Sequence, residues 1–539
     1  MVDILIKRGQ IVDGSGAPAF FADIAVKDGK IVQIKPDIAA SAKKTIDASG
    51  LQVAPGFLDS HSHSDASVFT GSDSYNYLEQ GVTTQIAGQC GSSPAPYTAG
   101  SMEGAEEKLT RQELRERAEK AKTPASFMKA AESAGFGTNM AFFIGQGTLR
   151  EKVLGYSGAA PDSRQMTIMQ QDLKEAMEAG YLGVSSGLVY APSVYATTEE
   201  LIELIKIMAP YDGIYASHIR GEGDNVLRSV REAIRIGEEC GVPVWISHLK
   251  VMGKHNEGIS QRLLEEIDRA NARGVAVFAD QYPYTAGSAP LSSQIPPKYL
   301  TGGIPALLKR LKSSVIRRQI EHSIFCEANV FESAIYSAGF GGCLIVEGDK
   351  TPQYKNKTIG QIAEEEGKDP MDVLADVLLA NDGLAQGIYF NQCASDLLRI
   401  MGHPNVFLGS DWSDYGDGRV DPEQPGGGHP RGTASAVRRL ELVRDFRLRT
   451  MEESVKNLTY DTARALGLVE HGLLREGWDA NICVFDYHKL HATADYSHPF
   501  RKNQGIYWVL VNGQLAVEEG TALGTRAGKV LKRKKSEKR

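Results

Sequence analysis

The middle of the chain repeats a helix followed by a short strand, and this repetition limits the possible folds more than any other feature. Residues 198–208 place apolar side chains at helical spacing, and the β-like run 213–217 follows them. The same order recurs with a helix after Asp224 and the run 242–247, and again with a helix that leads into the run 275–279. Because strands in such repeats lie parallel and about eight of them close into a barrel, we predict an α/β fold with a (β/α)8 TIM-type barrel.

An open doubly wound sheet is the alternative fold. Such a sheet usually carries a glycine-rich phosphate-binding loop between an early strand and helix, and the sequence has neither a GxGxxG nor a Walker A pattern at such a place. The pattern therefore favours the closed barrel.

The ends of the chain and one internal stretch depart from this alternation. Residues 1–57 and 465–527 both read as short strands with turn signals, which predicts one small β-sandwich domain built from both termini and leaves 58–464 for the barrel. The stretch at about 288–345 is rich in Ser, Pro and Gly and then in Lys and Arg, which predicts an inserted subdomain that covers the barrel mouth. The last residues, 528–539, form a basic tail that we expect to be solvated.

Composition excludes several classes of protein. The 60 Lys and Arg stand against 67 Asp and Glu, a net charge of −7, which argues against a nucleic-acid partner. The six Cys form no CxxC pair, so neither a disulfide scaffold nor a zinc finger is expected. No apolar run reaches the roughly 18 residues of a membrane span, and early charges at Asp3, Lys7 and Arg8 disfavour a signal peptide. We therefore expect a cytoplasmic protein without a membrane partner, and the sequence does not indicate its oligomeric state.

Two histidines lie close together just after an apolar segment near the start of the predicted barrel. His61 and His63 follow the run 53–59. Residues i and i+2 of a strand point to the same side, so these two imidazoles can bind one metal ion. An HxH pattern alone is a weak signal, because pairs of surface histidines are common.

Other potential ligands follow predicted strands in the same way. His218 and His248 come directly after two consecutive β-like runs, and Asp411 follows the run 406–410. Side chains at the carboxyl ends of parallel barrel strands converge on one mouth. Any one of these histidines could equally be a core or surface residue, but the chain has only 12 His, and chance seldom places them at successive strand ends. The set predicts a metal centre.

Cys90 adds a thiolate to this set. It ends the β-like run 83–89, and a thiolate is a good zinc ligand that zinc keeps deprotonated. The alternative, a small buried residue, fits the other five Cys better, since they do not share this position at a strand end.

These motifs together resemble the amidohydrolase superfamily and, within it, the D-aminoacylase (N-acyl-D-amino-acid deacylase) family. The likeness covers nearly the whole chain and is carried by the segments 56–63, 81–91, 215–220, 246–250, 282–286, 409–411 and 429–431. Cys90 is the discriminating feature. Most binuclear amidohydrolases bridge their metals with a carboxylated Lys, whereas this family has Cys in that place.

The resemblance implies a role for each matching residue. Cys90, His218 and His248 would hold a tight zinc ion. His61 and His63 would face a second, weaker zinc position that shares Cys90, and Asp411 would be the general base. The implied substrate-binding residues are Tyr190, Lys250, Tyr282, Tyr284, Ser288 and Arg431. The segment between Asp411 and Arg431 is longer than the family pattern, which makes Arg419 a rival for Arg431, and Leu249 stands where a polar residue would be expected.

The implied function is zinc-dependent hydrolysis of N-acyl-D-amino acids to a carboxylate and a free D-amino acid. The preference for the D centre follows from the resemblance alone, and hydrophobic, D-Glu and D-Asp side chains all remain open. A cyclic-amide hydrolase of the dihydroorotase or hydantoinase type is the alternative, but it should carry a metal-bridging Lys, and no Lys stands at a predicted strand end between His63 and His218. A barrel that had become a non-catalytic scaffold would have lost metal ligands, and this chain retains every ligand type.

Overall fold

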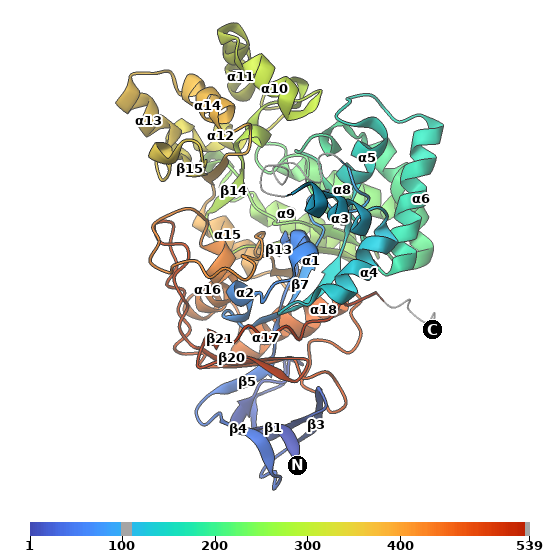
Figure 1. Ribbon diagram of the computed structural model, residues 1–539, viewed down its shortest axis with the longest axis vertical. Helices are drawn as coiled ribbons and strands as arrows, with labels where there is room; N and C mark the ends of the chain where they lie inside the picture. Colours follow the sequence, from blue (N-terminus) through green and yellow to red (C-terminus); the bar gives the residue numbers. More distant parts are fainter. Residues whose placement is uncertain (99–109, 534–539) are drawn as a thin grey trace.

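The computed structural model describes residues 1–98 and 110–533 of the chain. Figure 1 shows three parts along the long axis: a sheet that holds the N-terminal strands at the bottom, the barrel in the middle, and a helical layer with α10 and α11 at the top.

Parallel strands form the barrel. One sheet has the order β17-β13-β12-β11-β10-β9 and the other the order β6-β7-β8. Their bounds are β6 (Phe57–Asp59), β7 (Val82–Ala87), β8 (Asn139–Phe142), β9 (Ile144–Gly145), β10 (Gly183–Gly187), β11 (Ile214–His218), β12 (Val244–Ile246), β13 (Val277–Gln281) and β17 (Val406–Leu408).

Two backbone contacts close the ring between these sheets. Ser60 donates its amide to the carbonyl of Leu408 at 2.9 Å, and Phe143, which separates β8 from β9, donates to Ala87 at 2.9 Å. With β8 and β9 counted as one strand, the described residues contain the eight parallel strands of the predicted (β/α)8 barrel, and this fold class is confirmed.

Amphipathic helices surround the strands. In α8 (Val226–Cys240) the buried residues Val230, Ala233 and Ile234 lie on one face against the barrel, and the helix ends at Gly241, whose φ of +66° suits glycine. The other outer helices are α4 (Pro124–Ala134), α5 (Gln146–Leu154), α6 (Ser163–Ala179), α7 (Thr198–Ile205), α9 (Ser260–Ala272), α15 (Ala394–Met401) and α16 (Arg431–Asp445). Inside the ring, Trp245 and Phe407 stack with ring centroids 5.3 Å apart, so the barrel interior is a packed core.

Both ends of the chain share one sheet at the foot of the barrel. Its order is β21-β20-β19-β18-β5-β1-β2-β3, with β4 paired to β1. The strands are β1 (Val2–Ile11), β2 (Phe20–Lys27), β3 (Lys30–Lys35), β4 (Ala42–Asp47), β5 (Gln52–Pro55), β18 (Ile482–Phe485), β19 (Ile506–Val511), β20 (Gln514–Glu518) and β21 (Thr521–Ala522). Strand β5 joins the two halves, because it pairs in parallel with β1 and antiparallel with β18.

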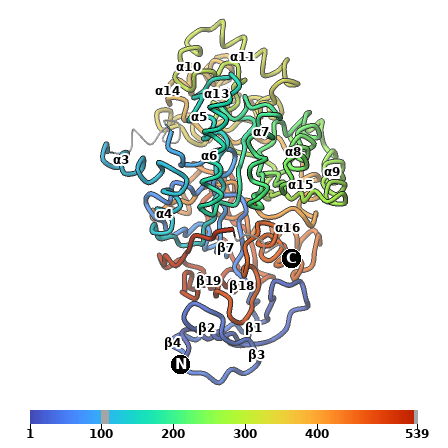
Figure 2. Tube along the Cα trace, turned by 90° about the vertical axis from the view of Figure 1, so that its right-hand side faces the viewer, coloured from blue at the N-terminus to red at the C-terminus, as the bar shows by residue number. Residues whose placement is uncertain are grey.

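A second layer interrupts the barrel between β13 and α15. It contains the antiparallel sheet β14-β16-β15 and its own apolar core, and Figure 2 shows its helices above the barrel. Its elements are β14 (Ala286–Pro290), α10 (Gly303–Leu311), α11 (Ser314–Cys326), α12 (Ala334–Ala338), β15 (Cys343–Glu347), α13 (Ile359–Glu366), α14 (Pro370–Ala380) and β16 (Gln386–Phe390). They continue well past the predicted limit at residue 345. Helices α13 and α14 have the same apolar spacing as barrel helices, so periodicity does not reveal that they pack in this layer.

The described part of the basic tail contacts the barrel. The carbonyl of Lys529 accepts the amide of Met140 at 2.9 Å, and Leu531 donates its amide to the carbonyl of Met140 at 2.7 Å, so residues 529–531 run along β8. Residues 534–539 of the predicted tail lie outside the described residues. Among the described helices, none combines the length and the apolar character that crossing a bilayer requires.

Candidate metal centre and active site

The carboxyl ends of five barrel strands bring one sulfur, four imidazoles and one carboxylate together. His61 and His63 follow β6, Cys90 follows β7, His218 ends β11, His248 follows β12 and Asp411 follows β17. These residues come from segments far apart in the sequence, and the parallel barrel is what makes them neighbours.

Cys90, His218 and His248 form one compact donor group. Their ligand atoms lie within 4.8 Å of one another, and Cys90 Sγ is 3.4 Å from His248 Nε2. Ligand atoms of a tetrahedral zinc site with bonds of 2.0–2.3 Å lie about 3.5 Å apart, so this separation fits an ion between them. His218 Nδ1 is buried without a hydrogen-bond partner, as expected for a nitrogen that binds a metal ion.

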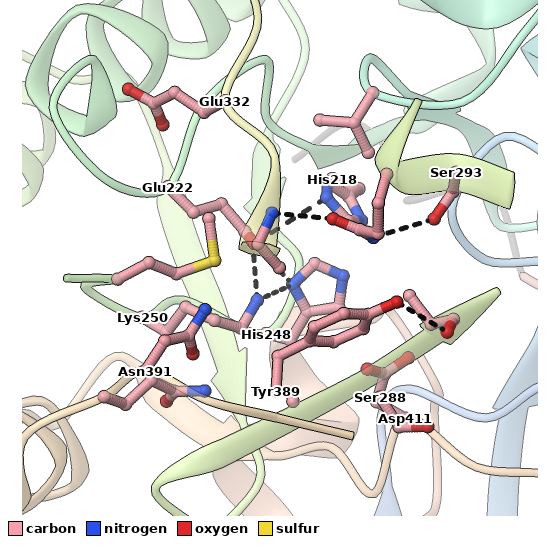
Figure 3. A pocket seen from close by; sticks show the side chains of 18 of the residues that line it. His218, Glu222, His248, Lys250, Ser288, Ser293, Glu332, Tyr389, Asn391 and Asp411 are labelled. Carbon is pink, nitrogen blue, oxygen red and sulfur yellow. Dashed lines mark hydrogen bonds and ion pairs between the residues drawn. The ribbon is translucent and has the colours of Figure 1, made fainter. Parts of the chain in front are cut away.

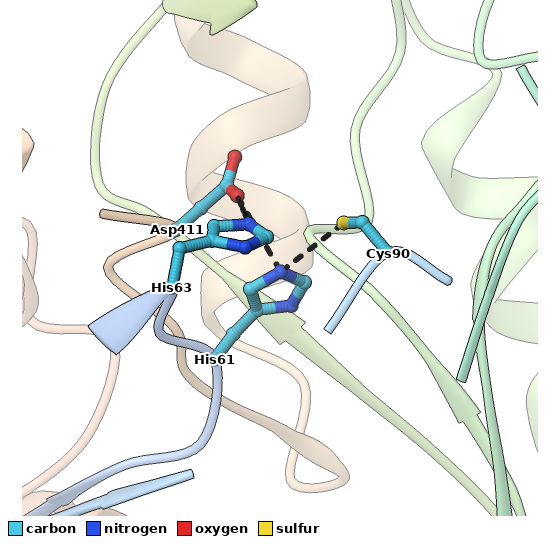
Figure 4. A group of neighbouring side chains, drawn as sticks. All are labelled: His61, His63, Cys90 and Asp411. Atoms are coloured by element: carbon cyan, nitrogen blue, oxygen red, sulfur yellow. Dashed lines mark hydrogen bonds and ion pairs between the residues drawn. The ribbon is translucent and has the colours of Figure 1, made fainter. Parts of the chain in front are cut away.

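A second donor group shares the same cysteine. His61, His63, Cys90 and Asp411 also have ligand atoms within 4.8 Å of one another (Figure 4). Cys90 Sγ lies 3.4 Å from His61 Nε2, and His63 Nε2 lies 3.0 Å from Asp411 Oδ1. Two nitrogens, a carboxylate oxygen and a shared sulfur are ligands that zinc accepts, so these residues fit a second ion beside the first.

The backbone is strained at three of these residues. Cys90, His248 and Asp411 have φ values of +54°, +35° and +53°, a region that non-glycine residues seldom occupy. Such conformations persist only where the surroundings impose them, and they cluster at functional sites.

The electrostatics favour a thiolate and a carboxylate here. Burial alone would raise the pKa of the Cys90 thiol, but the imidazoles of His61 and His248 outweigh it and hold that pKa well below its usual value of 9.0. Burial would likewise raise the pKa of Asp411, yet the nearby Arg431 and His248 hold it well below 3.8. Both shifts favour the charged form that a metal ligand or a base needs.

Two buried acids orient the imidazoles. Asp280 Oδ2 lies 3.2 Å from His61 Nδ1, and Glu222 Oε1 lies 3.1 Å from His248 Nδ1. In both rings the Nε2 atom is thus left to face Cys90, which is the arrangement of carboxylate–histidine–metal sites. The sequence analysis missed Asp280 and Glu222. Their position in the sequence was the only signal of this role: Asp280 lies on strand β13, and Glu222 lies four residues after His218.

Arg431 is the cation nearest to the proposed base. Its Nη1 lies 2.9 Å from Asp411 Oδ2, and its guanidinium lies over the rings of Tyr282 and Trp412, with centroid distances of 4.9 and 5.3 Å. Arg431 Nη2 donates to the carbonyl of Ser288 at 3.2 Å, while Nε is buried without a hydrogen-bond partner. This unused donor makes Arg431 a suitable residue to grip a carboxylate.

Five of the six predicted substrate residues line one cavity, together with His218, His248 and Asp411. They are Tyr190, Lys250, Tyr282, Ser288 and Arg431. A wider cavity, which shares Asp411 and Arg431 with the first, opens next to His63 and Cys90. The donor groups thus lie where the two cavities meet.

Three other residues from the sequence analysis lie elsewhere. Tyr284 lines neither of these cavities, and its hydroxyl donates to the carbonyl of Pro430 at 3.3 Å. Arg419 pairs with Glu79 at 3.0 Å at the surface, and Leu249 is buried in the barrel core. The structure therefore brings Arg431, and not its rival Arg419, to Asp411.

Comparison with known proteins identifies the family. Residues 44–203 match the amidohydrolase family. The chain is 33% identical over 540 residues to D-aminoacylase of Alcaligenes xylosoxydans xylosoxydans, with 98% of each chain covered. The chain belongs to the D-aminoacylase family of amidohydrolases. Other members from the same organism are N-acyl-D-aspartate deacylase, 32% identical over 98% of this chain and 95% of that one, and N-acyl-D-glutamate deacylase, 30% identical over 99% and 97%.

Solved structures of the family have the same fold. D-aminoacylase superposes with a TM-score of 0.80 at 30% identity, over 99% of this chain and 100% of that one. N-acyl-D-glutamate deacylase from Bordetella bronchiseptica, in complex with zinc and a phosphonate mimic of the tetrahedral intermediate, gives 0.79 at 31%, over 98% and 99%. L-hydantoinase from Arthrobacter aurescens gives 0.56 at 17% identity, over 99% of this chain and 100% of that one, a likeness of fold alone.

Proposed function

We propose that this protein is a zinc-dependent hydrolase of N-acyl-D-amino acids, which cleaves a linear amide bond to give a carboxylate and a free D-amino acid. One observation carries the proposal: Cys90 takes part in both donor groups at the barrel mouth, in a family whose relatives are named for this reaction. The deacylase from Bordetella bronchiseptica holds zinc and a mimic of the tetrahedral intermediate, which supports the same chemistry for this chain.

The donor groups divide the proposed zinc ligands. Cys90, His218 and His248 would hold the tight ion, and His61 and His63 would hold a second, weaker one that shares Cys90. A related D-aminoacylase has a binuclear metal centre, which supports two positions. A zinc ion held there would act as a Lewis acid that polarises the amide carbonyl and makes a nearby water more acidic.

Asp411 is the proposed general base. Its carboxylate lies 3.0 Å from His63 Nε2 and 3.4 Å from His61 Nε2, at the edge of both cavities, where it can take a proton from the attacking water. The same oxygen can then return that proton to the nitrogen of the leaving amine. Arg431 and the histidines keep the pKa of Asp411 low against the opposing effect of burial, so the carboxylate is ionised before water arrives.

Arg431 is the proposed anchor for the α-carboxylate of the substrate. Its Nε is available for a hydrogen bond, and Tyr282 below the guanidinium holds it in one orientation. An α-carboxylate at Arg431 and a carbonyl at the metal centre fix two points, so a pocket for the side chain supplies the third point that selects one hand. Tyr190 and Ser288 line both cavities and would contact the amide between them.

Hydrolysis assays with purified protein test this function. N-acetyl-D-methionine should be hydrolysed, and its L counterpart should not. Hydantoins and dihydroorotate, which are the substrates of the alternative cyclic-amide hydrolase, should not be hydrolysed. Chelation should abolish hydrolysis, and added zinc should restore it. Turnover of the cyclic amides in place of N-acetyl-D-methionine would replace the proposal with the alternative. The cytoplasmic location expected from the sequence stays a prediction, which cell fractionation would test.

A further inference from the structure

The proposed grip on the α-carboxylate depends on one guanidinium. Among the described residues that line the narrower of the two cavities, Lys250 and Arg431 are the cations apart from histidines. Lys250 Nζ donates to the buried Glu222 at 2.5 Å (Figure 3). Arg431 keeps a buried Nε without a hydrogen-bond partner, so its position decides where the carboxylate binds. The groups that hold Arg431 in place therefore bear on the proposed reaction.

Helix α16 does not hold this side chain by itself. Arg431 is the first residue of the helix, where the helix dipole is positive and a cation is electrostatically unfavourable. The preceding residue, Pro430, gives no side-chain cap. The amide of Arg431 is one of the groups at a helix start that lack a partner within the helix. His429 supplies this partner, because its Nδ1 accepts the amide at 3.0 Å.

The other nitrogen of the His429 ring binds strand β14. His429 Nε2 lies 3.0 Å from the carbonyl of Ala286, and it must donate, since a carbonyl only accepts. An imidazole with one donor and one acceptor nitrogen is the uncharged form. Burial and the nearby Arg431 hold the pKa of His429 well below 6.5, which favours this form at neutral pH. The ring thus connects two backbone segments through a fixed pair of nitrogen atoms.

The same strand also receives the guanidinium. Strand β14 lies at the edge of its sheet, and an edge strand presents a row of backbone groups on its outer side. Arg431 Nη2 donates to the carbonyl of Ser288 at 3.2 Å, two residues after Ala286. Ser288 lines the narrower cavity together with Asp411 (Figure 3). The bond from His429 to Ala286 therefore fixes how far Arg431 reaches along β14 toward Asp411.

Aromatic rings from two parts of the molecule hold the imidazole. Tyr284 and Tyr496 lie edge-on to the His429 ring, with centroid distances of 5.2 and 5.1 Å. Tyr496 comes from the segment between β18 and β19 of the terminal sheet. In the same segment, the carbonyl of Pro499 accepts the hydroxyl of Thr433 on α16 at 2.5 Å. The terminal domain therefore contacts both His429 and the first turn of the helix that carries the proposed anchor.

We propose that His429 is a positioning residue for the proposed reaction and that Tyr496 supports it from the terminal domain. His429 lines neither cavity and belongs to neither donor group, so it acts through Arg431. It keeps the guanidinium where a bound α-carboxylate brings the amide carbonyl to the metal centre. The inference rests on the proposed function, because Arg431 is the anchor in that reaction.

The variant His429→Asn removes the link to β14 but keeps an oxygen that can accept the amide of Arg431. In the zinc-loaded enzyme, we expect kcat/KM for N-acetyl-D-methionine to fall about tenfold, mainly through KM, because the anchor is no longer fixed. N-acetyl-D-methioninamide lacks the carboxylate, so its kcat/KM should change by less than about twofold. The ratio of the two values separates a loss of anchoring from a general loss of structure.

His403→Asn is the matched control. His403 is 9% exposed, and its Nδ1 also accepts the amide two residues on, at 3.3 Å. It precedes β17, at the end of the strand away from the barrel mouth, so the same substitution there should leave kcat/KM for both substrates unchanged. Circular dichroism and zinc content verify that each variant is folded and loaded.

A double variant tests whether His429 acts through Arg431. Added to Arg431→Lys, His429→Asn should lower kcat/KM for N-acetyl-D-methionine by less than about threefold instead of tenfold, because the guanidinium it positions is gone. Full multiplication of the two losses would overturn the inference. Equal losses with the acid and its amide, or no loss in a folded, zinc-loaded His429→Asn enzyme, would overturn it as well.

Tyr496→Ala is the second variant, and its half-buried position makes it easier for the fold to accept. It removes one ring from the side of His429 and should raise KM for N-acetyl-D-methionine about two- to threefold, with kcat and zinc content unchanged. An unchanged KM would contradict the role of Tyr496 and, if His429→Asn does not fold, the inference as a whole. Failure of the wild-type enzyme to hydrolyse any N-acyl-D-amino acid would instead overturn the proposed function, whereas losses confined to the variants concern His429.

Discussion

The two walls of the active site are built in different ways. The barrel wall carries its polar groups at the ends of short buried strands, with the backbone strained at Cys90 and His248 and with Asp280 bonded to His61. The opposite wall comes from the inserted layer, which has its own apolar core and its own sheet. Glu332 links this layer to the loop after β11 through two backbone amides.

This difference separates two tasks. Groups that must meet at one point within tenths of an ångström lie at the ends of the barrel strands or just after them. Groups that only shape a cavity lie on a layer that can vary without moving a metal ligand. We therefore expect substitutions on the barrel wall to change metal content and rate, and substitutions on the inserted wall to change the choice of substrate.

Cys90→Ala should have the largest effect. It removes the donor common to both groups, so zinc content should fall and hydrolysis should become undetectable, because both proposed zinc positions lose a ligand. Elemental analysis with the N-acetyl-D-methionine assay measures both quantities. Cys240→Ala is the control, because that buried cysteine lies on α8. Full zinc occupancy in Cys90→Ala would remove Cys90 from the ligand set.

Asp411→Asn should separate rate from metal content. The amide keeps the shape but cannot accept a proton, so we expect activity to fall by about 100- to 10,000-fold while the tightly bound zinc remains. The matched control is Asp421→Asn, an exposed residue of the following loop. Substantial activity in a zinc-loaded Asp411→Asn enzyme would exclude Asp411 as the base.

Arg431→Lys should weaken recognition of the α-carboxylate. Lysine keeps the charge but loses the planar fork, and we expect kcat/KM for N-acetyl-D-methionine to fall by about 10- to 100-fold, mainly through KM. The amide of the same substrate, which has no carboxylate, should lose far less. Arg419→Lys is the control, since Arg419 pairs with Glu79 at the surface. If Arg419→Lys and not Arg431→Lys raised KM, the two arginines would exchange roles.

The barrel wall is also the part that the sequence predicts best. Helix-then-strand periodicity predicts parallel strands, and parallel strands carry the residues after them to one mouth, so His218, His248 and Cys90 could be grouped without coordinates. Where the sequence does not decide which of two nearby residues lines the cavity, the local backbone geometry decides it. Tyr282 and Tyr284 are two positions apart, but β13 ends at Gln281, and the chain then turns so that Tyr282 lines the cavity and Tyr284 does not.

Other parts give no local signal at all. Glu222 and Asp280 act through the histidines that they contact, and such contacts depend on the closed barrel. The extent of the inserted layer is hidden because α13 and α14 have ordinary amphipathic spacing, and only packing decides which core they join. Tertiary contacts, rather than local propensity, therefore determine which acids contact the histidines and which helices belong to the inserted layer.

Phe331→Ala should have the smallest effect and sharpens the contrast between the walls. Phe331 lines the cavity from the inserted layer and belongs to neither donor group. Its replacement should therefore leave the zinc content unchanged, and it should also leave the rate with a small substrate such as N-acetyl-D-alanine unchanged. Turnover of N-acetyl-D-methionine should fall by about tenfold, because the side chain loses apolar contact. The ratio of kcat/KM for the two substrates measures this change. Equal losses for both substrates, or a loss of zinc, would mean that the inserted wall also supports the chemistry, and the separation of tasks between the two walls would fail.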